Sequence, residues 1–168
     1  MTVSLRGAEL DDLGFLADLY AGEDVRPFLA AGGRYERDGI AEQLERAPEE
    51  GGLLVVELDG DRAGALFWER RNIRSRIAHV GGIAIHPDFR GRHLADDATR
   101  LLQHHLIRER GYHRIELEIY GFNERAIRHA ERSGYIREGV KRKAYRHNDG
   151  WVDGVLYALV EEDLAEPR

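Results

Sequence analysis

The segment from residue 77 to residue 106 most constrains the fold, because a strand pattern leads through a short loop straight into a helical pattern. Residues 77–85 are mostly apolar, as in a buried strand, and His86-Pro87-Asp88 ends the run. An apolar face then repeats at helical spacing. Its members are Leu94, Ala98, Leu101, Leu102, His105 and Leu106. This order predicts helices packed on a sheet.

The loop at this junction carries Arg90, Gly91, Arg92 and His93 immediately before the helix. A helix N-terminus presents unpaired backbone N–H groups and a positive partial charge, which together suit a pyrophosphate group. Gly91 would let the backbone approach such a ligand closely. The sequence lacks the G-x-x-x-x-G-K-[ST] pattern of a P-loop, so another kind of phosphate-binding loop is indicated.

The rest of the chain also alternates between strand and helix patterns. Before the junction we expect strands at 3–6, 53–58 and 63–68 and helices at 11–20 and 40–46. After it we expect a strand around 115–119, a helix from 123 to 134, and a hairpin of strands 135–146 and 151–160, with Gly111 as a left-handed cap before them. The order predicts one domain over residues 1–168, of the α/β (α+β) class, with a mixed sheet of about seven strands and helices on both faces.

Composition narrows the function classes. The 168 residues are 42% hydrophobic and 33% charged, as in a soluble globular domain, and no apolar run is long enough to cross a bilayer. The N-terminus shows no signal-peptide pattern, so we expect a cytoplasmic protein. The absence of cysteine excludes disulfides, thiolate metal sites and a cysteine nucleophile.

The formal net charge of −6 disfavours nucleic-acid binding, and the basic stretches 70–76 and 141–143 are interpreted as solvated hairpin surface.

The junction loop resembles the motif R/Q-x-x-G-x-G/A of the GNAT superfamily of N-acetyltransferases, with that family's His-Pro-Asp-aromatic-Arg-Gly lead before it. Two further segments are similar to the same family. They are Asn123-Glu124-Arg125-Ala126-Ile127, followed by Ser133-Gly134-Tyr135, and the tail from Arg137 to Asp153, which resembles the ribosomal-protein and polyamine acetyltransferase branch. The matches extend from about Leu5 to Leu164, in the order that the family has.

This resemblance implies acetyl-CoA as the co-substrate and assigns roles to the junction. The pyrophosphate would be held by the backbone N–H groups of Arg90, Gly91, Arg92, His93, Leu94 and Ala95. The backbone of Ile83 would orient the acetyl carbonyl, and that of Ile85 would pair with the pantetheine arm. Asn123 would bond the pantetheine region, and the same residue is also expected to cap its helix.

Three positions depart from the family's pattern. His93 stands where a glycine is usual, so its side chain either crowds the phosphates or adds a contact, while the backbone donor is kept. Ala130 replaces the tyrosine with which many members protonate the leaving thiolate. His79, four residues before Ile83, stands where a glutamate base is common. Because histidine titrates near neutrality, it is the candidate general base, and a structural strand histidine is the alternative.

The remaining polar and aromatic side chains suggest packing or acceptor binding. His105 is predicted to be a core histidine, and no metal site is predicted, because no histidines stand at ligand spacing with a carboxylate. Glu116 and Glu118 are expected on one exposed face of their strand, where a cationic amine could approach. Three aromatic residues are interpreted as packing residues, with a place in the acceptor pocket as the alternative: Phe28, Tyr35 and Trp68.

Taken with the resemblance, these observations predict an N-acetyltransferase in which an amine attacks the thioester of acetyl-CoA directly, in a ternary complex. The acceptor would be a protein N-terminus, a polyamine or another small amine, and the enzyme a monomer or homodimer. A non-catalytic acyl-CoA-binding module is the alternative, because Ala130 and His93 depart from the pattern. An RNA- or ribosome-docking protein that uses the basic stretches is a third.

Overall fold

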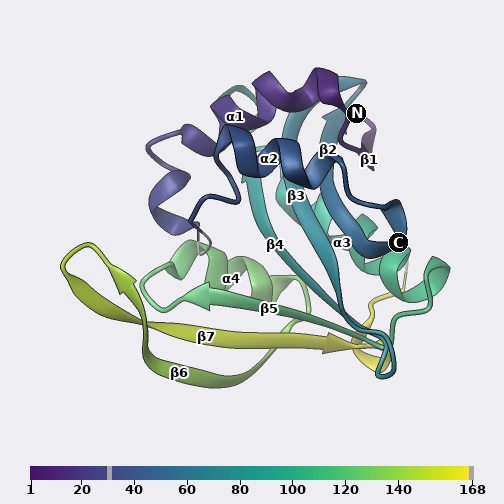
Figure 1. Ribbon diagram of the computed structural model, residues 1–168. Helices are drawn as coiled ribbons and strands as arrows, with labels where there is room; N and C mark the ends of the chain where they lie inside the picture. The colour runs from purple at the N-terminus through teal and green to yellow at the C-terminus, as the bar shows by residue number, and fades with distance from the viewer. Residues whose placement is uncertain (30–31, 167–168) are drawn as a thin grey trace.

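The computed structural model describes residues 1–29 and 32–166, and Figure 1 shows its elements in chain order. Four α-helices and seven strands follow one another much as the sequence predicts. They are β1 (Val3–Gly7), α1 (Leu13–Ala21), α2 (Arg37–Leu44), β2 (Gly51–Leu58), β3 (Asp61–Asn72), β4 (Ile77–Ile85), α3 (Leu94–His104), β5 (Arg114–Tyr120), α4 (Glu124–Arg132), β6 (Ile136–His147) and β7 (Gly150–Val160).

The seven strands form one mixed sheet in the order β1-β2-β3-β4-β5-β7-β6. Neighbouring strands are antiparallel except β4 and β5, which run parallel because α3 connects them across the sheet. The predicted fold class, with its mixed sheet of about seven strands, is confirmed. The predicted turn at residues 148–150 joins β6 to β7, with Asn148 in the left-handed region at φ 52°.

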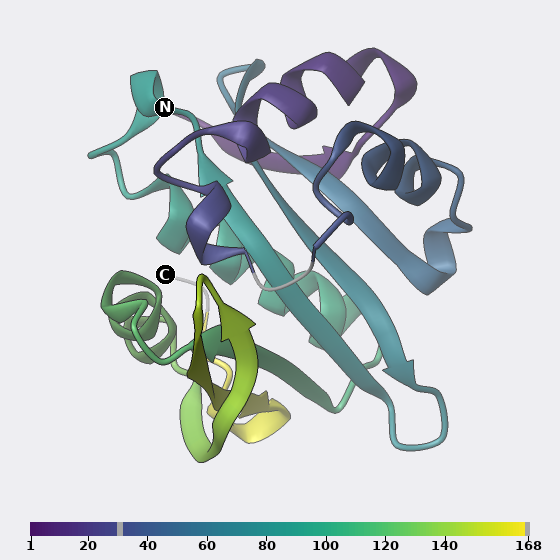
Figure 2. The ribbon, with the colours of Figure 1, turned by 60° about the vertical axis from the view of Figure 1, so that its left-hand side comes forward.

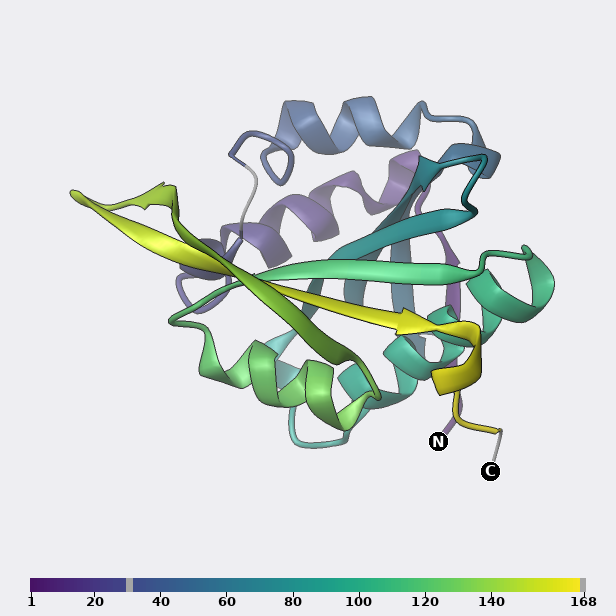
Figure 3. The same cartoon turned by 90° about the horizontal axis from the view of Figure 1, so that it is seen from below.

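Helices cover both faces of this sheet, as Figure 3 shows from below. On one face, α1 and α2 pack through Leu16, Leu19 and Ile40 against β2, β3 and β4. On the other, Ala98, Leu102 and Leu106 belong to a larger apolar cluster under α3 and α4. No helix of the described residues is long and apolar enough to cross a membrane. The two clusters leave the sheet buried on both sides along its centre.

The predicted core position of His105 is wrong. After His104 the helix widens into a π-helical turn over His105–Glu109, in which the Arg110 N–H donates to the carbonyl of His105. The His105 side chain is 40% exposed and pairs with Glu109 at 2.6 Å. Leu101 is also exposed, while Leu106 and Ile107 fill the core. Gly111 follows with φ 74°, in the left-handed conformation expected of it.

The parallel pairing of β4 and β5 is short. Only residues 77–79 of β4 pair with 114–116 of β5. Beyond His79 and Glu116 the two strands diverge, and Figure 1 shows β4 and β5 separating in this region. The last six residues of β4 therefore have no strand partner on the side of β5. An open strand edge is left in the middle of the sheet, next to the junction loop.

A buried carboxylate ties the N-terminal segment to the sheet. Asp12 is 1% exposed, and its two oxygens accept hydrogen bonds from Arg6 at 2.7 and 2.9 Å and from the Arg62 Nε at 2.7 Å. The backbone N–H of Glu9 donates a fourth bond at 2.8 Å. The Arg6 guanidinium holds the pKa of Asp12 well below its usual range. The carboxylate is therefore charged and fully partnered at neutral pH.

We predict that Asp12→Ala lowers the free energy of unfolding by about 3 kcal/mol, because it leaves two partly buried guanidinium groups without their shared partner. Urea denaturation of the two proteins measures the change. Asp11→Ala is the control, since the neighbouring Asp11 is exposed. An equal loss in both variants would contradict a special role for the buried carboxylate.

Candidate active site

The open edge of β4 contains a β-bulge at Gly82. The register of β3 and β4 shifts between the pairs Ala65–Ala84 and Phe67–Gly81, and Gly82 takes a φ of 60°. The Tyr20 hydroxyl donates a hydrogen bond to the Gly82 carbonyl at 2.7 Å. A Cβ atom at Gly82 would lie 2.6 Å from the hydroxyl oxygen of Tyr35, so only glycine fits there.

This bulge sets the direction of the backbone amides of Ile83 and Ile85. The two ends of a trans peptide point in opposite directions, so the N–H of Ile83 points away from Tyr20, to which the Gly82 carbonyl is bound. The N–H of His86 donates to Ala63 on β3, and amides alternate sides along a strand. The N–H of Ile85 therefore faces the open edge.

The junction loop forms a cradle of backbone donors. Gly91 and His93 both have positive φ, at 76° and 58°, and His93 is the N-cap of α3. In the described part of the chain, no backbone N–H of residues 91–96 donates a hydrogen bond within the protein. The N–H of Arg90 differs, since it donates to Pro87 at 3.3 Å. The turn at residues 87–89 thus engages the N–H of Arg90, which was one of the six backbone donors predicted for the pyrophosphate.

The left-handed conformation of His93 explains why a glycine would suit this position. Its side chain is 85% exposed, and the ring reaches back toward Asp96, with Nδ1 3.5 Å from a carboxylate oxygen. The sequence left open whether the His93 side chain crowds the phosphates or adds a contact to them. In this conformation the side chain does not crowd the loop. The backbone donor at residue 93 is retained.

The side chain of Arg90 turns away from the cradle. Its Nε donates to the carbonyl of Ile85 at 3.0 Å, and its Nη1 forms a short ion pair with Asp24. Asp24 lies in the loop after α1, and the Arg90 guanidinium lowers the pKa of this carboxyl group. Arg90 therefore connects the end of β4 to the loop on the α1 side of the sheet.

Asn123 and Ala130 lie on α4, beside the diverging strands. The Asn123 side chain accepts a hydrogen bond from the N–H of Ala126 at 3.2 Å, so it caps the helix as predicted. Ala130 is 2% exposed and packs in the core under α3 and α4. Position 130, where the family resemblance led us to look for a tyrosine, thus carries only a methyl group.

His79 is the last residue of β4 that pairs with β5, opposite Glu116. Its ring lies 5.9 Å from that of Phe67. Burial lowers the pKa of His79 below its ordinary value, although the nearby Glu69 carboxylate opposes the shift. The imidazole is therefore neutral at pH 7 and able to accept a proton.

On the acceptor side, Trp68 is a packing residue, and the expected exposure of Glu116 and Glu118 is wrong. Trp68 is 3% exposed and belongs to the core on the α3 side, because side chains alternate along β3 and Phe67 takes the side of His79. Glu116 and Glu118 are half-buried and ion-paired, with Arg114 at 2.8 Å and Lys141 at 3.0 Å. Their face is covered by β6 side chains and is not an exposed strand surface.

The other two aromatic candidates lie on the side of His79. Tyr35 is buried against Gly82, and Phe28 is 42% exposed. Sequence reasoning missed Tyr20, which holds the bulge carbonyl. The adjacent pair Gly81-Gly82 in an apolar strand was the available signal for a bulge.

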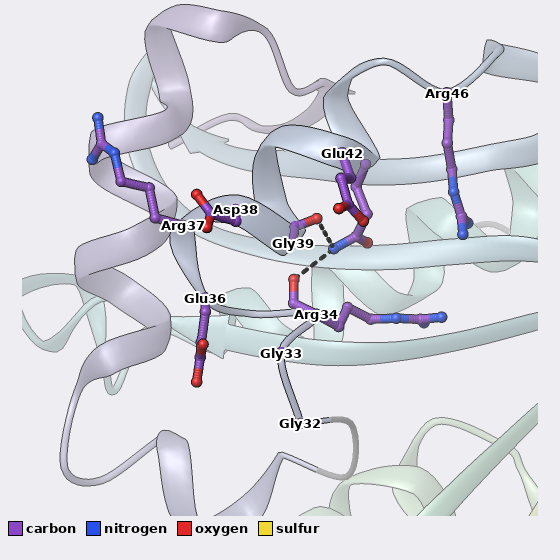
Figure 4. A pocket seen from close by; sticks show the side chains of 10 residues that line it. Gly32, Gly33, Arg34, Glu36, Arg37, Asp38, Gly39, Glu42 and Arg46 are labelled. Carbon is purple, nitrogen blue, oxygen red and sulfur yellow. Dashed lines mark hydrogen bonds between the residues drawn. The ribbon is translucent and has the colours of Figure 1, made fainter.

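A separate hollow of about 790 Å³ lies between α2 and the loop before it. Figure 4 shows Arg34 and Arg46 extending toward one end of this hollow, where both contact Glu69, at 3.2 and 3.4 Å. The amide of Gln43 fixes the loop by donating to the carbonyls of Arg34 and Gly39. None of the predicted coenzyme-binding residues lines the hollow.

Residues 15–135 match the model of the acetyltransferase (GNAT) family. The chain belongs to this family. A curated relative, the SPbeta prophage-derived uncharacterized N-acetyltransferase YokL of Bacillus subtilis, is 25% identical over 131 residues, which are 76% of this chain and 71% of YokL. Acetyl-CoA is accordingly the co-substrate of this GNAT enzyme, and the predicted kind of activity is confirmed.

Solved structures of GNAT enzymes show the same fold. Spermidine N-acetyltransferase from Vibrio cholerae, in complex with CoA and spermine, has a TM-score of 0.86 at 19% identity, covering 96% of this chain and 97% of that one. RimJ of Mycobacterium smegmatis, in complex with CoA-disulfide, has a TM-score of 0.81 at 20% identity, covering 98% and 84%. Among the described residues no group of histidine and carboxylate side chains is arranged to hold a metal ion.

The cradle fits the pyrophosphate of acetyl-CoA, because consecutive unbonded amides and a helix N-terminus converge there. We predict that Gly91→Val weakens acetyl-CoA binding at least tenfold, since a β-branched residue disfavours a φ of 76°. His93→Gly should bind equally well or more tightly, because it relieves the left-handed strain. Isothermal titration calorimetry measures both.

Gly139→Val is the matched control for this experiment, since Gly139 has an ordinary φ and open space around it. Loss of binding in His93→Gly would mean that the imidazole itself holds a phosphate group. The assignment of the donor to the backbone would then be wrong at this position.

Proposed function

We propose that residues 1–168 act as one acetyltransferase domain that moves an acetyl group from acetyl-CoA to a primary amine, in a ternary complex and without a covalent enzyme intermediate. The amine belongs to a protein N-terminus or a small molecule. The observation that carries this proposal is the open edge of β4, which runs from the neutral His79 to the donor cradle before α3.

Binding of the coenzyme would use backbone groups throughout. The amides of residues 91–95 would hold the pyrophosphate, and that of Ile85 would pair with the pantetheine arm along the open edge. Asn123 would contribute from the other wall, at the start of α4. The N–H of Ile83 would polarise the acetyl carbonyl, because the bulge turns this amide out of line with its neighbours.

Acetyl-CoA supplies the acetyl group as an activated thioester. His79 would take a proton from the acceptor's ammonium group, directly or through a water molecule, which leaves a neutral amine. The amine nitrogen then bonds to the carbonyl carbon, its second proton passes to solvent, the C–S bond breaks, and coenzyme A leaves as a thiolate. Since Ala130 has no proton to give, the thiolate would leave unassisted and take its proton from solvent.

Two structural neighbours support an amine as the acceptor. One is the Vibrio cholerae spermidine N-acetyltransferase, and another is the ribosomal-protein-S5-alanine acetyltransferase of Vibrio fischeri, with a TM-score of 0.80 at 16% identity. The names of these two enzymes give different amines, a polyamine and a protein alanine. Ala130 favours one rival, a domain that binds acyl-CoA without turning it over.

We expect acetyl-CoA at 100 times its Kd to raise the Tm by about 5–10 °C, since it binds the folded state alone. Coenzyme A release in a panel of primary amines then measures turnover. A rise in Tm without release for any amine would favour the non-catalytic module. No rise at millimolar acetyl-CoA would contradict coenzyme binding altogether.

We predict that His79→Ala lowers kcat about 100-fold, the lower end of what a positioned general base contributes. The rate of the unaltered enzyme should rise with pH and level off, because only neutral imidazole accepts the proton. Since the pKa of His79 is lowered, the midpoint of this rise should fall below about 6.5, the ordinary value for histidine. Initial rates of coenzyme A release from pH 5 to 8 measure it.

His79→Gln keeps a polar side chain without the titration, and His105→Ala removes a histidine on the outer side of the helical layer. Acetyl-CoA should bind all three variants as tightly as the unaltered enzyme. An unchanged pH profile in His79→Gln would make His79 a structural strand residue. Positioning alone would then account for the rate.

A further inference from the structure

Five aromatic side chains gather where β4 and β5 diverge. We call Phe28, Tyr120, Phe122, Tyr145 and His147 the aromatic wall. The Phe28 and Phe122 rings lie 5.8 Å apart, and Phe122 lies 5.5 Å from Tyr120 and 4.6 Å from His147. Tyr120 also lies 5.6 Å from Tyr145. Three separate parts of the chain thus contribute to one cluster: the loop after α1, the end of β5, and β6.

The aromatic wall stands on the same face of the sheet as His79. Residues two apart on a strand share a face, so Glu116, Glu118 and Tyr120 form one row along β5. Glu116 is the register partner of His79, and the row leads from it to the wall. Figure 2 shows the segment after α1 and the β6–β7 hairpin on the same side of the diverging strands, and the ring contacts of Phe122 with Phe28 and His147 connect the two.

The wall remains open to a ligand. Phe28 is 42% exposed and Phe122 39% exposed, although each already contacts another ring. Two neighbouring exposed phenylalanines gain stability by burying their faces against a further apolar group. Tyr145 directs its hydroxyl to Glu118 at 2.6 Å, so the polar end of this ring is already bonded.

The charges on this face do not favour a second ammonium group. Glu69 is surrounded by Arg34, Arg46 and Arg71, at 3.2, 3.4 and 3.7 Å. Besides burial, which lowers the pKa of His79, Glu69 and Glu116 act to raise it and Arg71 and Arg34 act to lower it, so the charges around the imidazole oppose one another. A polycation would bring its further charges toward these guanidinium groups and would be repelled.

Glu118, a carboxylate that contacts the aromatic wall through Tyr145, is also engaged. Lys141 contacts one of its oxygens at 3.0 Å and Tyr145 the other at 2.6 Å. A second ammonium group would have to displace Lys141 to gain this partner. An uncharged group has no such cost, and the aromatic rings beside it offer an apolar surface.

From these contacts we propose that the acceptor is a primary amine that carries an aromatic ring and no second ammonium group. The ring packs against Phe28 and Phe122 while the amine reaches toward His79. This inference rests on the proposed acetyltransferase activity and names the substrate class of the same site. An aromatic cluster can also hold an ammonium group by cation–π contact, and that alternative is an outcome of the test.

Two matched pairs of acceptors test the proposal through kcat/KM for coenzyme A release. The first pair is 2-phenylethylamine and cadaverine, and the second is a short peptide with N-terminal phenylalanine and its counterpart with N-terminal lysine. We expect at least a tenfold preference for the aromatic member in one pair or both. The pair with the larger kcat/KM tells whether the ring comes from a small molecule or a protein N-terminus.

Phe28→Ala and Phe122→Ala should each lower kcat/KM for the aromatic acceptor about tenfold, mainly through KM. Turnover of propylamine, which carries no ring, should fall much less in the same variants, so the ratio of kcat/KM between the two acceptors reports on the ring contact. Leu101→Ala is the control variant, because Leu101 is equally exposed, at 41%, but lies on α3 across the sheet. It should leave both acceptors unaffected.

A higher kcat/KM for cadaverine or the lysine peptide would overturn the proposal in favour of a cation site. An aromatic preference that survives both alanine variants would overturn the role of the wall. Acetyl-CoA binding without turnover of any aromatic amine would also overturn the inference, and the binding measurement keeps that failure distinct. Absence of acetyl-CoA binding would instead refute the proposed function on which the inference rests.

Discussion

The site depends on the early end of hydrogen bonding between β4 and β5. Three residue pairs join the two strands, and beyond them the edge of β4 is left without a strand partner. An open strand edge inside a domain is costly unless another group supplies its hydrogen bonds. The sheet can tolerate the opening because α1 and α2 cover one face, while α3 and α4 cover the other. An extended ligand arm is the natural partner for such an edge.

The positions of the proposed catalytic groups follow from the same divergence. His79 sits at the last joined pair, where burial is deep enough to keep its imidazole neutral. Gly82, three residues further, turns one peptide out of the strand pattern, and Tyr20 holds that peptide in place. The strand then ends at the donor cradle before α3. The proposed base, carbonyl-binding amide and phosphate-binding loop therefore lie in sequence on one strand and its extension.

Local patterns predicted most of this fold because they reflect local physics. The bounds of β4, the cap at Asn123 and the left-handed Gly111 each follow from a few neighbouring residues. The sequence did not show which face of the sheet carries Trp68. Because β3 is apolar on both faces, side-chain alternation does not tell which face packs against α1 and α2 and which against α3 and α4. His105 was misplaced because the buried face of the helix is narrower than its apolar pattern suggests, and Leu101 and His105 both lie at its exposed border.

The contact between Arg90 and Asp24 could not be found from the sequence either, because 66 residues separate its members. It has a consequence for changing this enzyme's acceptor. Replacing the loop after α1 with that of a relative, in order to change the acceptor, would remove Asp24. The Arg90 side chain would then lose its carboxylate partner at the end of β4, which leads into the cradle. Acceptor-loop grafts should therefore carry an acidic residue at position 24. Grafts without one would alter coenzyme affinity together with acceptor choice.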